Sequence, residues 1–220
     1  SLAELLPVSE KNMGMDFKIK RGLRGASYPP KLWNPVWLGP LESDEIADLF
    51  NEPVEIEELY EEAIQAWESS ASNSIVDKTL EFYTRFYLQD NILVKSDRAS
   101  MMSSLEVRAP FLDNDVVEFA RKIPHQFKYR DRQTKYILKK SLDTILPHDI
   151  LYRKKKGFGM PLTSWLRSWE DCEFSRKNIS YSDPLWVKDR LSEHKMCKKD
   201  HRLFLWCWLT LQYHSRTNIS

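Results

Sequence analysis

The chain has 220 residues, of which 42% are hydrophobic and 12% aromatic, and its formal net charge is +1. This composition excludes a disordered chain and supplies enough apolar side chains for a packed core. A near-neutral charge argues against nucleic acid or an anionic membrane as the partner. Every apolar run is far shorter than the ~20 residues of a membrane-spanning helix, so we expect no membrane contact.

The cysteines and the amino terminus bear on location and completeness. Cys172, Cys197 and Cys207 match no metal-binding spacing, which favours reduced thiols in a cytoplasmic protein. The five histidines are scattered, so we expect no metal site. The chain starts without an initiator Met and without a secretory signal pattern, and this predicts a fragment or an excised domain.

Residues 1–70 predict a lead-in of short helices, because Pro and Gly recur through residues 1–40. A basic helix is expected over residues 17–24, and extended backbone is expected at residues 28–30. Ser43 is expected to cap an acidic helix. Residues 42–68 contain eleven acidic residues and no Lys or Arg. A solvated helix face explains this run, and a partner-binding acidic surface is the alternative.

Residues 71–170 have the strongest helical periodicity. An amphipathic helix is expected over residues 75–93, followed by a break near Ser96-Asp97 and a second helix through Leu105 that ends at Pro110. Asp113 is expected to cap the next helix, which Pro124 stops. A further helix is predicted over residues 134–145.

The remaining elements also read as helices, which start at Pro161, Pro184 and His201. There is no internal repeat and no sustained alternation typical of a strand. The sequence therefore predicts a mainly α fold, a single multi-helical region over residues 1–220. Within it, residues 1–70 form the lead-in, residues 71–170 the core and residues 171–220 the carboxy-terminal helices.

Self-contained catalytic machinery is absent from the sequence. There is no G-x-S-x-G elbow, no H-E-x-x-H zinc helix and no G-x-x-x-x-G-K-S/T phosphate loop. Residues 121–156 instead hold twelve Lys or Arg against three Asp. Lys135 lies near a predicted helix start, and Lys154, Lys155 and Lys156 precede Gly157. Ammonium groups beside a glycine turn suit a polyphosphate, although a solvated basic loop has the same composition.

Glu106 and Arg108 stand among apolar residues at the expected end of a helix. Charges among apolar groups require partners, so a structural ion-pair network is predicted here.

Three stretches in this order resemble the glutamine-hydrolysing asparagine synthetase family. Residues 97–113, DRASMMSSLEVRAPFLD, are similar to its D-R-x-S-M … L-E-x-R-x-P-F-L-D block. Residues 135–139, KYILK, are similar to its K-x-x-L-R helix. Leu146-Pro147, Ile150 and residues 153–166, RKKKGFGMPLTSWL, match L-P-x-x-I-x-x-R-x-K-x-G-F-x-x-P-x-x-x-W-L. The resemblance is specific over residues 87–166 and only positional elsewhere.

The resemblance implies the helical carboxy-terminal part of an adenine-nucleotide α-hydrolase-like synthetase domain, whose parallel sheet lies outside this chain. In that family ATP and Mg²⁺ activate the aspartate side chain as an acyl-adenylate, and ammonia released from glutamine attacks it. By motif, Lys155 is implied to be catalytic, and Lys135 and Arg153 to contact pyrophosphate. The implied architectural positions are Asp97, Arg98, Glu106, Arg108, Asp113 and Gly157.

The chain also departs from the family pattern. The S-G-G-x-D-S loop, the S-G-x-G-x-D-E loop and an amino-terminal cysteine nucleophile do not occur in it. We therefore expect no activity and no tight ATP binding from the chain alone. The expected partners are the nucleotide-binding and glutaminase domains, and a homodimer through the exposed apolar face is also possible. The alternatives are a β-lactam synthetase-like enzyme, an amidotransferase acting on a cell-surface precursor, and a non-catalytic helical binding module.

Overall fold

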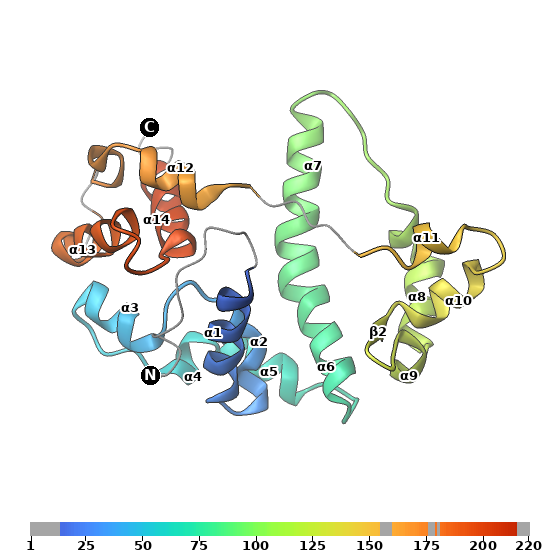
Figure 1. The fold of residues 1–220 in the computed structure, drawn as a ribbon. Coiled ribbons are helices and arrows are strands. Elements are labelled where there is room, and N and C mark those ends of the chain that lie inside the picture. The colour runs from blue at the N-terminus through green and yellow to red at the C-terminus, as the bar shows by residue number, and fades with distance from the viewer. Residues whose placement is uncertain (1–13, 155–159, 176–178, 180, 215–220) are drawn as a thin grey trace. The chain divides into compact units, whose positions relative to one another are not determined.

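The computed structural model describes residues 14–154, 160–175, 179 and 181–214. The chain divides into two compact units, one formed by residues 1–64 and 158–220 and the other by residues 65–157. Helices dominate both units, and the described residues contain only one sheet, of two short strands (Figure 1). The predicted mainly α fold is confirmed. Within the described residues, no helix combines the length and the apolar character needed to cross a bilayer.

The first unit is built from helices of both ends of the chain. Its elements are α1 (Met15–Ala26), α2 (Pro30–Leu38), α3 (Ser43–Phe50), α4 (Ile56–Leu59), α12 (Leu162–Ser168), the 3₁₀ helix η4 (Asp171–Phe174), α13 (Pro184–Lys195) and α14 (Arg202–His214). Helix α5 (Glu61–Glu68) crosses from the first unit into the second. The helices predicted at residues 17–24, at Pro184 and at residues 201–213 are all confirmed.

The core of the first unit surrounds α14. Leu205 and Leu209 of this helix are 0% and 2% exposed, and they join Leu166 of α12 and Leu191 of α13 in one buried cluster. Trp208 belongs to the same cluster, and its indole Nε1 donates to the carbonyl oxygen of Phe174 at 2.8 Å. An apolar helix from the chain's end thus holds α12, η4 and α13 together.

The cap of α3 differs from the prediction by one residue. Glu42, not Ser43, is the N-cap, because its side chain accepts from the backbone of Glu45 while Glu45 Oε2 accepts from the Glu42 amide at 3.0 Å. This reciprocal pair is a capping box. Ser43 is the first helical residue instead.

His194 is a fully buried histidine at the end of α13. Its Nδ1 accepts from the amide of His201 at 3.2 Å, which places the ring proton on Nε2, 3.4 Å from the carbonyl oxygen of Thr163. Burial lowers the pKa of His194, although the nearby Asp200 carboxylate acts in the opposite direction. Burial also lowers the pKa of His201, and its hydrogen bond with Glu193 partly offsets this effect.

These two histidines predict that the first unit loses stability in mild acid. A histidine whose folded pKa is depressed binds fewer protons in the folded than in the unfolded state. The contribution of the two histidines to the free energy of unfolding should therefore be fully present above the ordinary histidine pKa of about 6.5. It should decrease as the pH drops below that value. Urea unfolding between pH 5 and 8 measures this slope. His194→Gln should flatten it, whereas His148→Gln, at a side chain 78% exposed, should not. An unchanged slope in His194→Gln would contradict the assignment.

The second unit contains one long helix and a group of short elements. Its elements are α6 (Ile75–Phe82), the π-helix η2 (Tyr83–Leu93), α7 (Val94–Met101), the 3₁₀ helix η3 (Pro110–Leu112), α8 (Asn114–Lys122), α9 (His125–Lys128), β1 (Tyr129–Arg130), β2 (Gln133–Thr134), α10 (Tyr136–Leu142) and α11 (His148–Leu151).

The long helix runs from α6 through η2 into α7 without interruption (Figure 1). The predicted break near Ser96-Asp97 is wrong, because both residues lie inside α7. In η2 the i→i+5 bonds widen the turn, and side chains four residues apart come close to alignment. The Tyr83 and Tyr87 rings meet edge to face with centroids 5.9 Å apart.

The segment after α7 is not the helix that the sequence predicted. The helix ends at Met101, Ser104 has a positive φ of 54°, and the residues up to Ala109 form no regular structure. Pro110 contributes to this lack of helix, because helical backbone angles are unfavourable for the residue before a proline. The prediction for Asp113 is confirmed: its carboxylate accepts from the Asp115 amide at 3.0 Å and caps α8.

The second unit has little buried core among its described residues. Between residues 65 and 154 only Phe82 is buried. Met102, Phe111 and Ile145 are 89%, 68% and 70% exposed. A unit that leaves so many large apolar side chains in water has a surface suited to a partner.

Candidate functional site

Lys135 occupies the junction between a tight hairpin and α10. Strands β1 and β2 pair antiparallel, with Tyr129 opposite Thr134, and the two linking residues Asp131 and Arg132 both have positive φ. Two such residues are the requirement of the type I′ hairpin. Lys135 itself has φ 57° as the N-cap of α10, and it is exposed. The backbone conformation of the hairpin therefore determines the position of Lys135 at the start of α10.

A polar cluster links the end of α11 to α10. The Tyr152 hydroxyl donates to Asp143 Oδ1 at 3.0 Å, and Lys140 Nζ donates to Asp143 Oδ2 at 3.2 Å. The Tyr152 ring stacks on His148 with centroids 4.5 Å apart, and Lys139 Nζ lies 5.4 Å from the centre of the same ring. Because Lys139 is one turn beyond Lys135 and Tyr152 directly precedes Arg153, the cluster brings the two motif segments into one group.

The electrostatics of this cluster follow from its hydrogen bonds. The Tyr152 hydroxyl, followed by the Lys140 ammonium, lowers the pKa of Asp143. Asp143 in turn raises the pKa of Lys140 and of Tyr152 through the same hydrogen bonds. Lys140 thus remains a firmly charged cation that is committed to Asp143.

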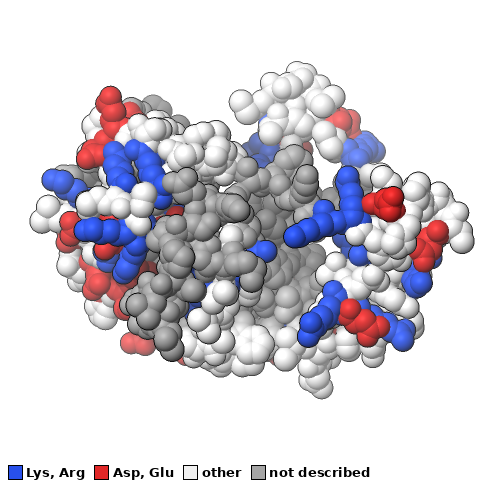
Figure 2. Space-filling view, in the orientation of Figure 1, with Lys and Arg blue, Asp and Glu red and all other residues white. Residues whose placement is uncertain are grey.

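Lys135, Arg153 and the neighbouring Lys154 are all exposed. None of the three makes an ion pair with another residue in the part of the chain that the structure describes. Lys155 and Gly157 lie outside the described residues. Figure 2 shows Lys and Arg side chains exposed over the part of the second unit that contains α8–α11.

The other motif residues lie in different places. Asp97 and Arg98 are exposed on α7. The predicted helix-end position of Glu106 and Arg108 is wrong, and the described residues show an ion pair between the two rather than a network. They follow the helix in an irregular segment and form a single pair, with Arg108 Nε 2.6 Å from Glu106 Oε1 and side chains 88% and 70% exposed. So exposed a pair contributes little to stability.

A groove of about 1190 Å³ runs through the second unit between the α6–η2 helix and α8. Leu80 and Leu88 line one side, and Phe111, Leu112 and Val117 line the other. Polar and charged side chains also line it, among them Arg85, Arg121 and Lys122.

Tyr152→Phe should release Asp143 from its main hydrogen bond. The pKa of Asp143 is then expected to rise toward the ordinary carboxyl value, because this hydrogen bond to the carboxylate is lost. The rise should be incomplete, because Lys140 still favours the charged form. A pH titration of the Asp143 side-chain carboxyl signal by NMR measures the change. Tyr129→Phe, at another exposed tyrosine of this unit, should leave that titration as it is. An Asp143 titration unaltered by Tyr152→Phe would contradict the geometry.

Sequence reasoning missed this Tyr152–Asp143 cluster. The one available signal was the i,i+3 spacing of Lys140 and Asp143 on a predicted helix. Nothing in the sequence indicated that Tyr152 reaches back to Asp143 across the intervening turn.

Comparisons with known proteins identify the family. The family model described as asparagine synthase matches residues 13–216. Asparagine synthetase (glutamine-hydrolyzing) 1 of Bacillus subtilis strain 168 is 34% identical over 156 residues, which cover 68% of this chain and 24% of that protein. Asparagine synthetase (glutamine-hydrolyzing) 3 of the same strain is 41% identical over 102 residues, covering 45% and 17%.

A vertebrate relative gives the same result at lower identity. Asparagine synthetase (glutamine-hydrolyzing) of Gallus gallus is 26% identical over 116 residues, covering 51% of this chain and 20% of that protein. The chain thus spans between 17% and 24% of the length of these relatives. No solved structure gives a significant match. A family match over nearly the whole chain is decisive: the chain belongs to the asparagine synthase family.

Proposed function

We propose that this chain is the helical, phosphate-contacting part of a glutamine-dependent synthetase that converts aspartate to asparagine. The observation that supports the proposal is the contact of Tyr152 with Lys139 and Asp143, which connects the segment that begins at Lys135 to the residue before Arg153. These are the segments whose sequences match the family's motifs. The relatives named above are called glutamine-hydrolyzing asparagine synthetases, which supports the same reaction.

The basic groups fit the anionic part of ATP. Exposed ammonium and guanidinium groups without carboxylate partners can contact phosphate oxygens, and Arg can do so with two parallel bonds. When bound, ATP supplies the adenylyl group that activates a carboxyl group. Lys135, Arg153 and Lys155 would then stabilise the negative charge that develops on the departing pyrophosphate. We place Lys155 as the catalytic member because it matches the motif lysine.

Magnesium has no complete protein cage in this part of the chain. Within the described residues, no three potential His, Cys, Asp or Glu ligands converge. Mg²⁺ commonly keeps several waters and binds through one or two carboxylates together with substrate phosphates. The chain's proposed contribution is therefore its cationic groups, which would contact the phosphates that Mg²⁺ also binds.

The rest of the same protein is the proposed partner of the second unit's apolar surface. Only Phe82 is buried between residues 65 and 154 of the described chain, and Met102, Phe111 and the groove beside α8 stay open. The relatives are four to six times longer than their matched part. A nucleotide-binding sheet packed on this surface would bury it and complete the adenine-nucleotide α-hydrolase-like domain.

Self-association tests this partner assignment. Light scattering of the chain alone should show dimers or larger species that increase with concentration, because the apolar surface then pairs with a second copy. The double variant Met102→Ser, Phe111→Ser should shift the population toward monomer. The control is Tyr181→Ser, which alters an exposed residue of the other unit and should leave the association unchanged. Val187→Ser is unsuitable as a control because Val187 is buried. A monomer at every concentration would count against the assignment.

Product analysis tests the reaction itself. The full-length protein, given glutamine, ATP, Mg²⁺ and aspartate, should form asparagine, AMP and pyrophosphate in equal amounts. Mass spectrometry of parallel reactions with other carboxylic acids distinguishes a β-lactam synthetase-like enzyme or a cell-surface amidotransferase. Amide formation on another acid in preference to aspartate would refute the substrate assignment. The chain of residues 1–220 alone should form no product.

A further inference from the structure

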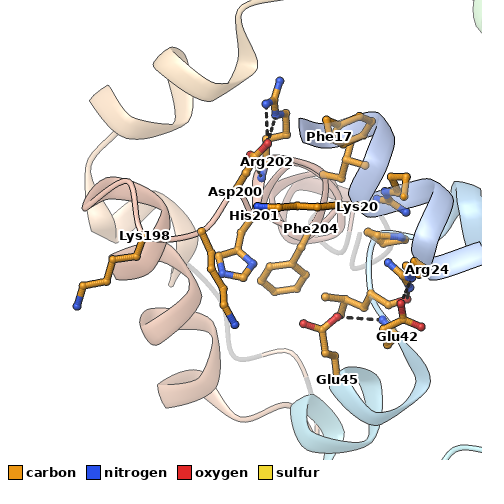
Figure 3. A pocket seen from close by; sticks show the side chains of 15 residues that line it. Phe17, Lys20, Arg24, Glu42, Glu45, Lys198, Asp200, His201, Arg202 and Phe204 are labelled. Atoms are coloured by element: carbon orange, nitrogen blue, oxygen red, sulfur yellow. Dashed lines mark hydrogen bonds and ion pairs between the residues drawn. The ribbon is translucent and has the colours of Figure 1, made fainter. Parts of the chain in front are cut away.

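The first unit contains a cavity of about 350 Å³ that no motif residue lines. Its walls come from α1, from residues 40–45 at the start of α3, and from the 198–204 segment that leads into α14. Figure 3 shows Phe17 and Lys20 entering from α1, Phe204 from α14, and Lys20 extending toward Asp200 and His201. The volume lies in the range typical of small-molecule sites.

Positive charge dominates the lining. Among the described residues that line the cavity, six are cationic and three carry carboxylates, which gives a formal charge of +3 with His201 neutral. Figure 3 shows Lys198 turned away from the cavity, which still leaves five cations. The cationic residues are Lys20, Arg21, Arg24, Lys198, Lys199 and Arg202.

Each of the three carboxylates already interacts with another group of the protein. Asp200 Oδ2 accepts from Arg202 Nε at 2.6 Å and its Oδ1 accepts from the Arg202 amide at 3.1 Å. Glu42 pairs with Arg24 and accepts from the Tyr28 hydroxyl, and Glu45 completes the α3 capping box. These commitments fix the acids in place, so an entering ligand meets an excess of cations.

Arg21, like Arg202 at 5% residue exposure, is a buried cation. Its side chain is nearly enclosed, at 8% residue exposure, and Nη1 donates to the carbonyl oxygens of Trp37 and Gly39 at 2.9 and 2.5 Å. Burial, together with the neighbouring Arg24 charge, lowers the pKa of Arg21 to about 10. A buried cation held by neutral carbonyls gains from a nearby anion.

An apolar wall lies beside the cations. The Phe17 ring has the guanidinium of Arg21 5.5 Å from its centre and that of Arg202 5.7 Å from its centre. Leu41 and Phe204 complete this side. The cavity can therefore receive a ligand with one anionic end and one apolar end.

We propose that this cavity binds a small phosphate-bearing organic molecule. Its phosphate would lie against Lys20 and Lys199, and its organic part against Phe17 and Leu41. The cavity belongs wholly to the first unit, so the proposal does not depend on the reaction proposed above.

Binding of phenyl phosphate and inorganic phosphate to residues 1–220 tests this. NMR titration should show saturable shifts for residues 17–24 and 198–204, and isothermal titration calorimetry should show phenyl phosphate binding more tightly than inorganic phosphate. The double variant Lys20→Gln, Lys199→Gln should weaken phenyl phosphate about tenfold, since it removes two charge-assisted contacts.

The matched control removes two exposed lysines outside the cavity on α1 and α13. Lys18→Gln, Lys188→Gln should leave the affinity within about twofold, because exposed distant charges are screened. Lys135→Gln should leave the shifts that phenyl phosphate induces in residues 17–24 and 198–204 unchanged, which distinguishes this cavity from the phosphate contact proposed for the second unit. Absence of saturable shifts, or equal losses in the test and control variants, would overturn the proposal. Equal affinity for the two probes would overturn the organic part of it.

Discussion

Replacing Lys155 by Ala in the full-length protein is expected to lower kcat for asparagine formation by about 10²–10³-fold. The proposed role of this ammonium group is to stabilise charge that grows on the leaving pyrophosphate. An interaction made chiefly in the transition state affects kcat more than substrate binding. The KM for aspartate should therefore change little. Steady-state rates with saturating ATP and glutamine measure the effect.

Lys154→Ala is the matched control for Lys155→Ala. Lys154 is an exposed neighbour in the same basic segment, but it occupies the variable position of the R-x-K-x-G-F motif. Its loss should reduce kcat less than about threefold if only general charge is removed. Comparable losses in both variants would assign the effect to the basic loop as a whole and contradict the specific role of Lys155.

Trp208→Ala is expected to destabilise the first unit by about 3–5 kcal/mol, the usual cost of removing a buried Trp. Trp208 is 5% exposed, packs against Phe204 with ring centroids 5.9 Å apart, and donates to the Phe174 carbonyl. Its removal opens a cavity and leaves the carbonyl oxygen of Phe174 with one hydrogen bond fewer. Urea unfolding of residues 1–220, followed by near-ultraviolet circular dichroism, measures the loss.

Trp206 provides the comparison on the same helix. It lies two residues before Trp208 and is 38% exposed. Trp206→Ala should therefore cost less than about 1 kcal/mol. If both substitutions cost the same, then α14 does not bury the face that the structure assigns to the core.

The fold was predictable where a local signal determines local geometry. Asp113 caps α8 and Pro184 opens α13 because side-chain and ring chemistry act within one turn. The density of Leu and Trp in residues 201–213 likewise predicted the buried helix that the structure shows as α14. The prediction failed at Ser96-Asp97, where poor helix formers sit within a long exposed helix that its neighbouring turns sustain.

Two other features had no readable signal. The hairpin at residues 129–134 turns at Asp131-Arg132, where both residues have positive φ. Arg is not among the residues typical of this turn, so the sequence did not indicate it. The cavity of the first unit joins Arg24 to Asp200, residues far apart in sequence that meet only through tertiary packing. Spacing and periodicity carry no information about such contacts. Motif resemblance located Lys135 and Arg153, but it did not reveal that Tyr152 and Asp143 tie their segments together.

Aspartate-dependent exchange of labelled pyrophosphate into ATP by the full-length protein tests the central claim most directly. The exchange reports reversible adenylate formation without glutamine or ammonia. We expect exchange that requires aspartate and Mg²⁺ and that Lys155→Ala and Lys135→Ala each reduce strongly, while Lys154→Ala preserves it. Exchange that does not depend on aspartate, or that survives the loss of both Lys135 and Lys155, would contradict the account.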